Sequence, residues 1–313
     1  MKTSVRAALA GALACGVLTT AIVISRQDDS PSAAPPKGPY VALGDSYTAG
    51  PKIPDQGGSP AGCDRSDRNY PALVARRLGL AAADFRDVSC SGATVADLSA
   101  AQSTDHGTNP AQLSALSDRT RLVTLGIGGN DIGFAALVKS CVKSGVLHFA
   151  LSGFKADTED AGEAGNAPCR AQYVSAGADE VRQRIEAADE RLGHALAEVK
   201  RRAPKARVYV VGYPAILPPH TTDCAGEMGL ASGDVSYLHD KEQQLNRMLR
   251  ERADKAGVGY VDTYTPSVGR DACADRQVRW VEPLVPLAPA AAVHPNERGE
   301  RGMADAVAKT LGL

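Results

Sequence analysis

Short apolar runs and longer amphipathic stretches alternate along most of this chain. The apolar runs have the length of buried strands, and several of them end in glycine or in a polar residue. They cover residues 40–43, 85–89, 121–125, 206–212 and 258–264. The pattern therefore predicts five strands.

Amphipathic helices are predicted between these strands. The clearest one repeats apolar residues at three- and four-residue steps and ends before Pro204; its buried face is made of Val181, Ile185, Ala188, Leu192, Ala195, Leu196 and Val199. Further helices are expected over residues 70–80, from 132, over 234–256 with Gly257 as a C-cap, and from 296. Because strands and helices alternate, we predict an α/β fold in which helices cover both faces of a parallel sheet.

The first 25 residues are interpreted as a targeting segment rather than as part of the fold. Lys2 and Arg6 precede an uncharged, mostly apolar run from Ala7 to Ser25, which is long enough to span a bilayer. We expect this segment to direct export, either as a cleaved signal peptide or as a retained membrane anchor. Residues 26–38 are rich in Pro, Ser and Asp and are expected to form a flexible linker. Residues 39–313 then form one domain.

Composition excludes some classes of partner. The chain has 313 residues, 43% hydrophobic composition and a formal net charge of −1. This is enough for one large core, and it gives no basic surface for nucleic acid. Apart from Cys15, the cysteines form an even set without a CxxC pair: Cys63, Cys90, Cys141, Cys169, Cys224 and Cys273. Behind an export segment such a set predicts disulfides, but it does not fix their pairing.

A serine stands at the end of the first predicted strand, in the sequence Gly44-Asp45-Ser46. The carboxyl edge of a parallel sheet is where sites form in open α/β folds. By itself this stretch is equally typical of a turn or a helix cap. Two other stretches change its interpretation. Gly128-Gly129-Asn130 follows the strand at 121–125, and His294 lies just before the last predicted helix.

With Ser91-Gly92 between them, these blocks give the order Ser46, Gly92, Asn130, His294. In this the chain resembles the SGNH family of GDSL-type esterases and lipases, above all its secreted actinobacterial lipase and phospholipase branch. The resemblance covers about residue 39 to the C-terminus. It implies a flavodoxin-like, three-layer α/β/α sandwich with a five-stranded parallel sheet. It also implies that the cysteines pair in sequential order, Cys63–Cys90, Cys141–Cys169 and Cys224–Cys273.

The resemblance implies a role for each of the four residues. Ser46 would be the nucleophile and His294 its base. The oxyanion donors would be the backbone N–H groups of Ser46 and Gly92 and the side-chain amide of Asn130. No metal or cofactor is implied.

One position departs from the family pattern. Members with a full triad carry Asp three residues before the histidine, where this chain has Ala291. We therefore expect a Ser46–His294 dyad in which the Ala291 carbonyl orients the imidazole. The alternative is a carboxylate recruited from elsewhere, with Glu282 and Asp262 as the best candidates.

The sequence thus predicts a monomeric serine ester hydrolase, secreted or anchored outside the cell membrane, that acts on lipid or short-chain acyl esters. A carbohydrate O-acetyl esterase and a catalytically silent binding domain are the alternatives. The segment 139–173 contains an apolar cluster and an acidic, glycine-rich stretch. It either covers an acyl chain or is a surface excursion.

Overall fold

The computed structural model describes residue 36 and residues 38–152, 166–219 and 224–313. The predicted targeting segment 1–25, most of the linker 26–38 and nearly all of the acidic stretch 157–166 lie outside the described residues. Residues 34–313 form one compact unit, and the description below concerns that unit alone.

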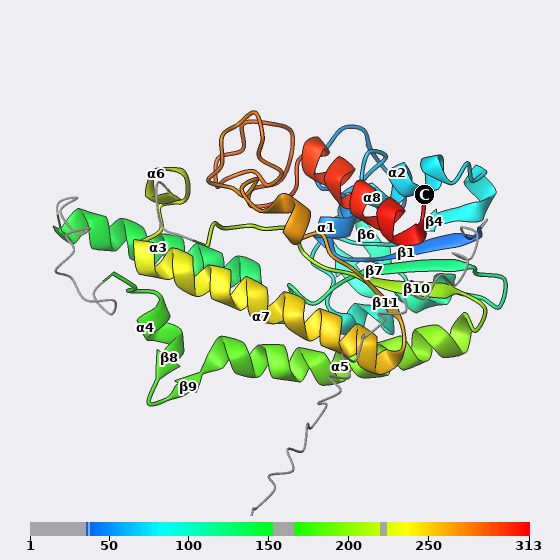
Figure 1. Cartoon of the computed structure of the whole chain (residues 1–313), viewed down its shortest axis with the longest axis horizontal. Coiled ribbons are helices and arrows are strands. Elements are labelled where there is room, and N and C mark those ends of the chain that lie inside the picture. Colours follow the sequence, from blue (N-terminus) through cyan, green and yellow to red (C-terminus); the bar gives the residue numbers. More distant parts are fainter. Residues whose placement is uncertain (1–35, 37, 153–165, 220–223) are drawn as a thin grey trace, which may run out of the picture. The chain divides into compact units, whose positions relative to one another are not determined.

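Five parallel strands form the central sheet, in the order β11-β10-β7-β1-β4 (Figure 1). Their bounds are β1 Tyr40–Gly44, β4 Phe85–Asp87, β7 Leu122–Gly126, β10 Arg207–Val211 and β11 Gly259–Val261. All five coincide with predicted apolar runs, although β4 and β11 are shorter than expected. The chain reverses its direction of travel across the sheet between β1 and β7, so the carboxyl ends of these two strands border the crevice where doubly wound folds place their sites.

Alternate residues of each strand face two separate cores. Val41, Leu43, Val123 and Leu125 pack with the side that carries the longest helices. Tyr40, Ala42 and Leu122 pack with the other side. Both faces of the sheet are therefore buried, which explains why the strands read as continuous apolar runs.

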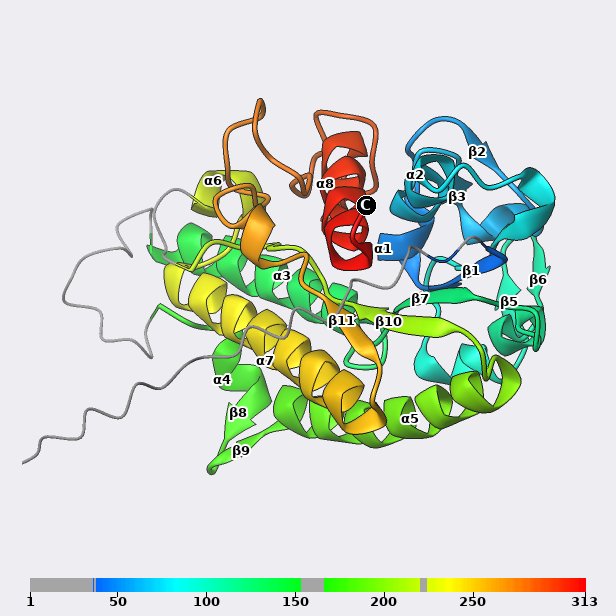
Figure 2. The same cartoon turned by 45° about the vertical axis from the view of Figure 1, so that its right-hand side comes forward.

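Helices cover both faces of the sheet, as predicted. On one face lie α2 (Tyr70–Arg77) and α8 (Glu297–Leu311), which contact each other. On the other lie α3 (Phe134–Ser152), α5 (Glu180–Arg202) and α7 (Ser232–Ala256), as Figures 1 and 2 show. The apolar face predicted for α5 is buried, and Gly257 ends α7 in the left-handed conformation. The three-layer α/β/α sandwich is confirmed.

Several small elements had no clear signal in the sequence. Three two-stranded antiparallel ribbons project from the loops: β2–β3 (Gln56–Gly57 with Arg65–Ser66), β5–β6 (Gln102–Thr104 with Gly107–Asn109) and β8–β9 (Val174–Ser175 with Ala178–Asp179). The short helices are α1 (Ser46–Ala49), α4 (Arg170–Tyr173) and α6 (Cys224–Met228). Strands of two or three residues are too short to show a period of two.

The structure contains the three disulfides in the sequential pairing that the resemblance implied, Cys63–Cys90, Cys141–Cys169 and Cys224–Cys273. The Cys63–Cys90 disulfide lies next to one of the predicted site residues, because Cys90 immediately precedes the Ser91-Gly92 turn. The Ser91 N–H also donates to the Cys63 carbonyl at 3.1 Å. This turn is therefore fixed both covalently and by a hydrogen bond.

Candidate active site

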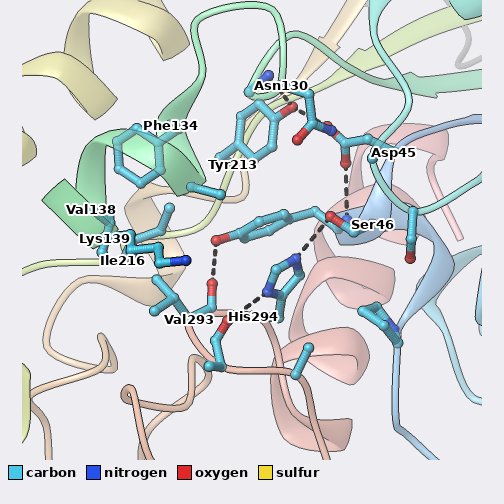
Figure 3. Close-up of a pocket in the computed structure, with 18 of the residues that line it drawn as sticks. Asp45, Ser46, Asn130, Phe134, Val138, Lys139, Tyr213, Ile216, Val293 and His294 are labelled. Atoms are coloured by element: carbon cyan, nitrogen blue, oxygen red, sulfur yellow. Dashed lines mark hydrogen bonds between the residues drawn. The ribbon is translucent and has the colours of Figure 1, made fainter.

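A cavity of about 570 Å³ opens at the carboxyl ends of β1 and β7. Its polar end brings together the four residues that the sequence singled out, Ser46, Gly92, Asn130 and His294. Its other walls are largely apolar, with side chains from α3, α7 and two loops: Phe134, Val138, Val142, Ile216, Leu245 and Leu284. Figure 3 shows the polar end beside the apolar wall.

Ser46 is the first residue of α1, directly after the turn that ends β1. Asp45 caps this helix, because its carboxylate accepts from the Tyr47 N–H at 2.9 Å. Gly44 has a φ of 156°, and a Cβ there would lie 2.6 Å from the Gly126 carbonyl oxygen. Only glycine allows the ends of β1 and β7 to approach this closely. The turn that follows places the Ser46 hydroxyl at the edge of the sheet.

His294 reaches the same point from the loop before α8. Its Nε2 lies 2.8 Å from the Ser46 Oγ (Figure 3). Its Nδ1 lies 2.8 Å from the carbonyl oxygen of Ala292. A carbonyl can only accept, so Nδ1 carries the hydrogen and Nε2 presents its lone pair to the hydroxyl. The pair has the geometry in which a neutral imidazole can take a proton from serine.

The expected orienting residue was wrong by one position. The Ala291 carbonyl accepts the backbone N–H of His294 at 3.3 Å, within the turn itself. The carbonyl of Ala292 is the one that faces Nδ1. The kind of acceptor, a neutral backbone carbonyl, is nevertheless the one expected.

Neither candidate acid contacts the imidazole. The Glu282 carboxylate is buried and accepts from the amides of Leu287, Ala288 and Asn296. Asp262 pairs with Arg250 and accepts from Thr265. Both carboxylates therefore serve local structure.

Three effects set the pKa of His294. Burial is the largest and lowers the pKa below the ordinary 6.5, because it disfavours the charged form. The hydrogen bond to the Ala292 carbonyl opposes this, and the positive charge of Lys52 lowers the pKa further. The imidazole is thus mainly neutral at pH 7, as a base must be.

Tyr47 holds the histidine loop in place. Its ring centroid lies 4.8 Å from that of His294, and its hydroxyl donates to the Val293 carbonyl at 2.5 Å. Val293 has a φ of 60°, which is strained for a β-branched residue. Strain of this kind persists where surrounding contacts enforce it. The residue after the serine is therefore the clamp on the loop that carries the histidine.

The Ser91-Gly92 peptide lines the same cavity. Gly92 has a φ of 78°, which favours glycine. Gln102 on β5 donates through Nε2 to the Ser91 carbonyl at 2.8 Å. Since a peptide unit is planar, holding that carbonyl also fixes the direction of the Gly92 N–H, which points to the opposite side. No sequence pattern points to Gln102, because its contact with Ser91 joins separate loops.

Asn130 is oriented by the same loop. Its Nδ2 donates to the Ala93 carbonyl at 2.9 Å, and the second hydrogen on Nδ2 remains for another acceptor. The neighbouring Asp131 accepts the Val95 N–H at 2.9 Å and pairs with Arg191. The loops after β4 and β7 are therefore joined to each other where they border the cavity.

Tyr213, which follows β10, links the serine turn to the glycine-rich turn. Its hydroxyl donates to the Asp45 carboxylate at 2.5 Å and accepts from the Gly129 N–H at 2.8 Å. Burial raises the pKa of Tyr213 well above its usual value, so the hydroxyl keeps its proton. Burial also raises the pKa of Asp45 to about 7. Tyr213 was not among the predicted site residues, and its place shortly after the strand β10 is the one sequence signal that points to it.

The sequence matches the model of the GDSL-like lipase/acylhydrolase family over residues 42–301. It is 39% identical over 303 residues to lipase 2 of Streptomyces coelicolor, in an alignment that covers 96% of this chain and 95% of that lipase.

Two crystal structures are similar to this chain in fold and in part of the sequence. The phospholipase A1 of Streptomyces albidoflavus NA297 superposes with a TM-score of 0.67 at 28% identity, over 87% of this chain and 98% of that one. The extracellular lipase of Streptomyces rimosus superposes with a TM-score of 0.65 at 26% identity, over 86% and 98% of the two chains.

The clamp formed by Tyr47 can be tested without a substrate. Tyr47→Phe keeps the ring on His294 but removes the donor to the Val293 carbonyl, so the free energy of unfolding should fall by about 1 kcal/mol. Denaturant unfolding measures this. Tyr173→Phe is the matched control, because no hydrogen bond of that hydroxyl is found among the described residues. Equal stability of both variants would contradict the clamp.

Proposed function

The chain belongs to the GDSL-like lipase/acylhydrolase family and is a carboxylic ester hydrolase, and from that premise we propose that it cleaves acyl esters through an acyl-enzyme on Ser46 with His294 as the base. The observation that carries the proposal is the 2.8 Å contact between Ser46 Oγ and His294 Nε2 at the end of a cavity. That contact is a hydrogen bond between a nucleophile and a base whose other ring nitrogen is already held.

In the first half-reaction His294 takes the hydroxyl proton while Ser46 Oγ attacks the ester carbonyl carbon. The tetrahedral intermediate collapses as the imidazolium gives its proton to the leaving alcohol oxygen, which leaves the acyl group on Ser46. In the second half-reaction His294 takes a proton from water as the water oxygen attacks the acyl carbon. The second tetrahedral intermediate then collapses with release of the carboxylic acid, and the imidazolium returns its proton to Ser46 Oγ. The Ala292 carbonyl keeps Nδ1 protonated throughout.

Negative charge develops on the former carbonyl oxygen in both intermediates. We assign its stabilisation to the backbone N–H groups of Ser46 and Gly92 and the free Nδ2 hydrogen of Asn130. The contacts that Gln102 makes with Ser91, and Asn130 with Ala93, support this assignment, because they fix two of the donors before the substrate arrives.

The walls of the cavity favour a fatty acyl group over an acetyl group. Phe134, Val138 and Val142 lie at four-residue steps on one face of α3, and they meet Ile216 and Leu245 across the cavity. An acetyl group would leave most of this apolar surface in water. The carbohydrate O-acetyl esterase is therefore the less favoured reading, and a silent binding domain would not need the contact of Ser46 with His294.

The proposal includes the role predicted for the N-terminal region in export. Residues 1–25 act as an export signal or an anchor, residues 26–38 as a linker, and residues 39–313 as the catalytic domain. The similar lipase of Streptomyces rimosus is described as extracellular, which supports secretion. We propose that the catalytic domain works as a monomer, since one chain by itself brings Ser46, Gly92, Asn130 and His294 to the same cavity.

A fluorophosphonate probe tests the acyl-enzyme proposal. The folded protein should incorporate one probe, because the probe reacts with serines that a neighbouring base activates. Ser46→Ala should abolish both labelling and the hydrolysis of a soluble ester, and Ser91→Ala, which alters a second serine at the cavity, should still be labelled. Labelling that survives Ser46→Ala would refute Ser46 as the nucleophile.

Asn130→Ala tests the oxyanion assignment. Loss of one donor should lower kcat by about 10²–10³, while KM changes little, because the bond strengthens as charge develops in the transition state. Steady-state kinetics on a soluble ester separates the two parameters. A change confined to KM would instead give Asn130 a role in binding the substrate.

A further inference from the structure

Helix α3 has two halves with different surroundings. Its first half lies against the domain, where Leu137, Val138 and Cys141 are buried. Its second half lies at the end of the molecule far from the sheet (Figures 1 and 2). There Val146, Leu147 and Leu151 are 56%, 58% and 81% exposed. A helix that begins as a wall of the catalytic cavity thus ends as an apolar surface.

The loop before His294 also runs from the cavity wall to an exposed apolar surface. Leu284 lines the cavity, while Val285 and Leu287 are 74% and 49% exposed. Among the described residues the exposed large hydrophobic side chains are few, and most of them lie on these two segments: Val146, Leu147, Leu151, Val285 and Leu287, with Val268, Val278 and Leu313 elsewhere. We call the first five the apolar rim. Its two segments each reach the cavity wall.

The exposed side of α3 is also basic. Lys139 and Lys143 precede Leu147 at four-residue steps, so the three lie along one face of the helix. No Asp or Glu occurs in α3. Neither lysine forms an ion pair with another described residue. The face therefore combines positive charge with apolar side chains, as helices that lie on anionic lipid do.

We propose that the apolar rim and the basic face of α3 dock the enzyme on the surface of an anionic lipid aggregate, from which the ester substrate enters the cavity. This proposal rests on the proposed function, since it supplies the substrate of the same site. A lipid held at the rim would meet Val142 and then Val138 along α3 on its way to Ser46. Docking and acyl binding would then use one continuous apolar path.

The geometry fits docking on the surface better than crossing a bilayer. By length and composition Phe134–Leu151 could span one, and only 28% of it is buried. However, the Cys141–Cys169 disulfide and the contacts with α7 hold its first half on the domain. The residues from Val146 to Leu151 add roughly 9 Å at 1.5 Å per residue. This is far shorter than a hydrocarbon core of about 30 Å, so the exposed end of α3 suits contact with the membrane interface rather than a bilayer span.

The experiment measures binding to vesicles by flotation, using the full chain in the Ser46→Ala background so that the lipid is not consumed. Vesicles of phosphatidylglycerol with phosphatidylcholine are compared with pure phosphatidylcholine. Leu147→Ser/Leu151→Ser should weaken binding to the anionic vesicles by tenfold or more, since each leucine loses its burial in lipid. The matched control, Val268→Ser/Leu313→Ser, removes two apolar side chains that are about half exposed and do not belong to the rim, and it should bind like the parent.

Charge is tested separately. Lys143→Gln should weaken binding to the anionic vesicles by about fivefold, and only at low salt. Its control is Lys205→Gln, which changes an exposed lysine in the turn between α5 and β10. Equal binding of the rim variant and its control would overturn the proposal, as would equal affinity for the two kinds of vesicle. Loss of a dimer in the rim variant with vesicle binding unchanged would also overturn it, because the rim would then pair two copies of the chain.

A second readout separates this proposal from the proposed function. With Ser46 intact, the rim variant should hydrolyse a soluble short-chain ester like the parent but act at least tenfold more slowly on anionic vesicles. Equal loss on both substrates would show that the variant damages the site and would contradict docking. A parent protein without activity on the soluble ester would refute the proposed function, and the flotation result would still decide the docking.

Discussion

The hydrogen bond between Ser46 and His294 joins residues that are 248 positions apart, and the arrangement of the site depends on it. The serine is fixed by the turn after β1 and the histidine by a loop before α8. These two segments belong to opposite ends of the domain sequence. They meet because β1 is an inner strand of the parallel sheet, between β7 and β4, and α8 packs on one face of that sheet. The fold thus brings Ser46 and His294 within hydrogen-bonding distance, which no local structure could do.

Buried polar contacts hold the serine turn, the histidine loop and the neighbouring loops in fixed positions. Tyr47 clamps the histidine loop, Tyr213 ties Asp45 to Gly129, and Gln102 holds the peptide before Gly92. Each contact connects two loops at the same sheet edge. In the proposed mechanism these contacts would hold the reacting groups in position in advance, so that little reorganisation would be needed when charge develops. None of them requires a carboxylate beside the imidazole.

Sequence reasoning predicted the strands, the long helices and the four block residues. The strands and helices were predictable because buried strands are continuous apolar runs and amphipathic helices have a period. The four block residues were identified by their resemblance to the SGNH family pattern. It failed where a role depends on a contact between loops, as for Gln102 and Tyr213. It also chose the carbonyl of Ala291 in place of Ala292. The strained φ of Val293 determines which carbonyl faces Nδ1, and a sequence pattern does not report that angle. The exposed end of α3 was evident in the sequence only as an apolar cluster within the segment 139–173, because a run of apolar residues does not show which of them the fold buries.

The central claim is that a backbone carbonyl, without an acid, orients His294. The most direct measurement is kcat/KM for a soluble ester as a function of pH. Only the neutral imidazole accepts the serine proton, so activity should fall as the pH drops through the pKa of His294. Burial and Lys52 both lower that pKa, so the midpoint should lie below 6.5, and Lys52→Gln should move it upward. A carboxylate beside Nδ1 would stabilise the imidazolium and raise the pKa. A midpoint above 6.5 in the parent protein would therefore contradict the dyad.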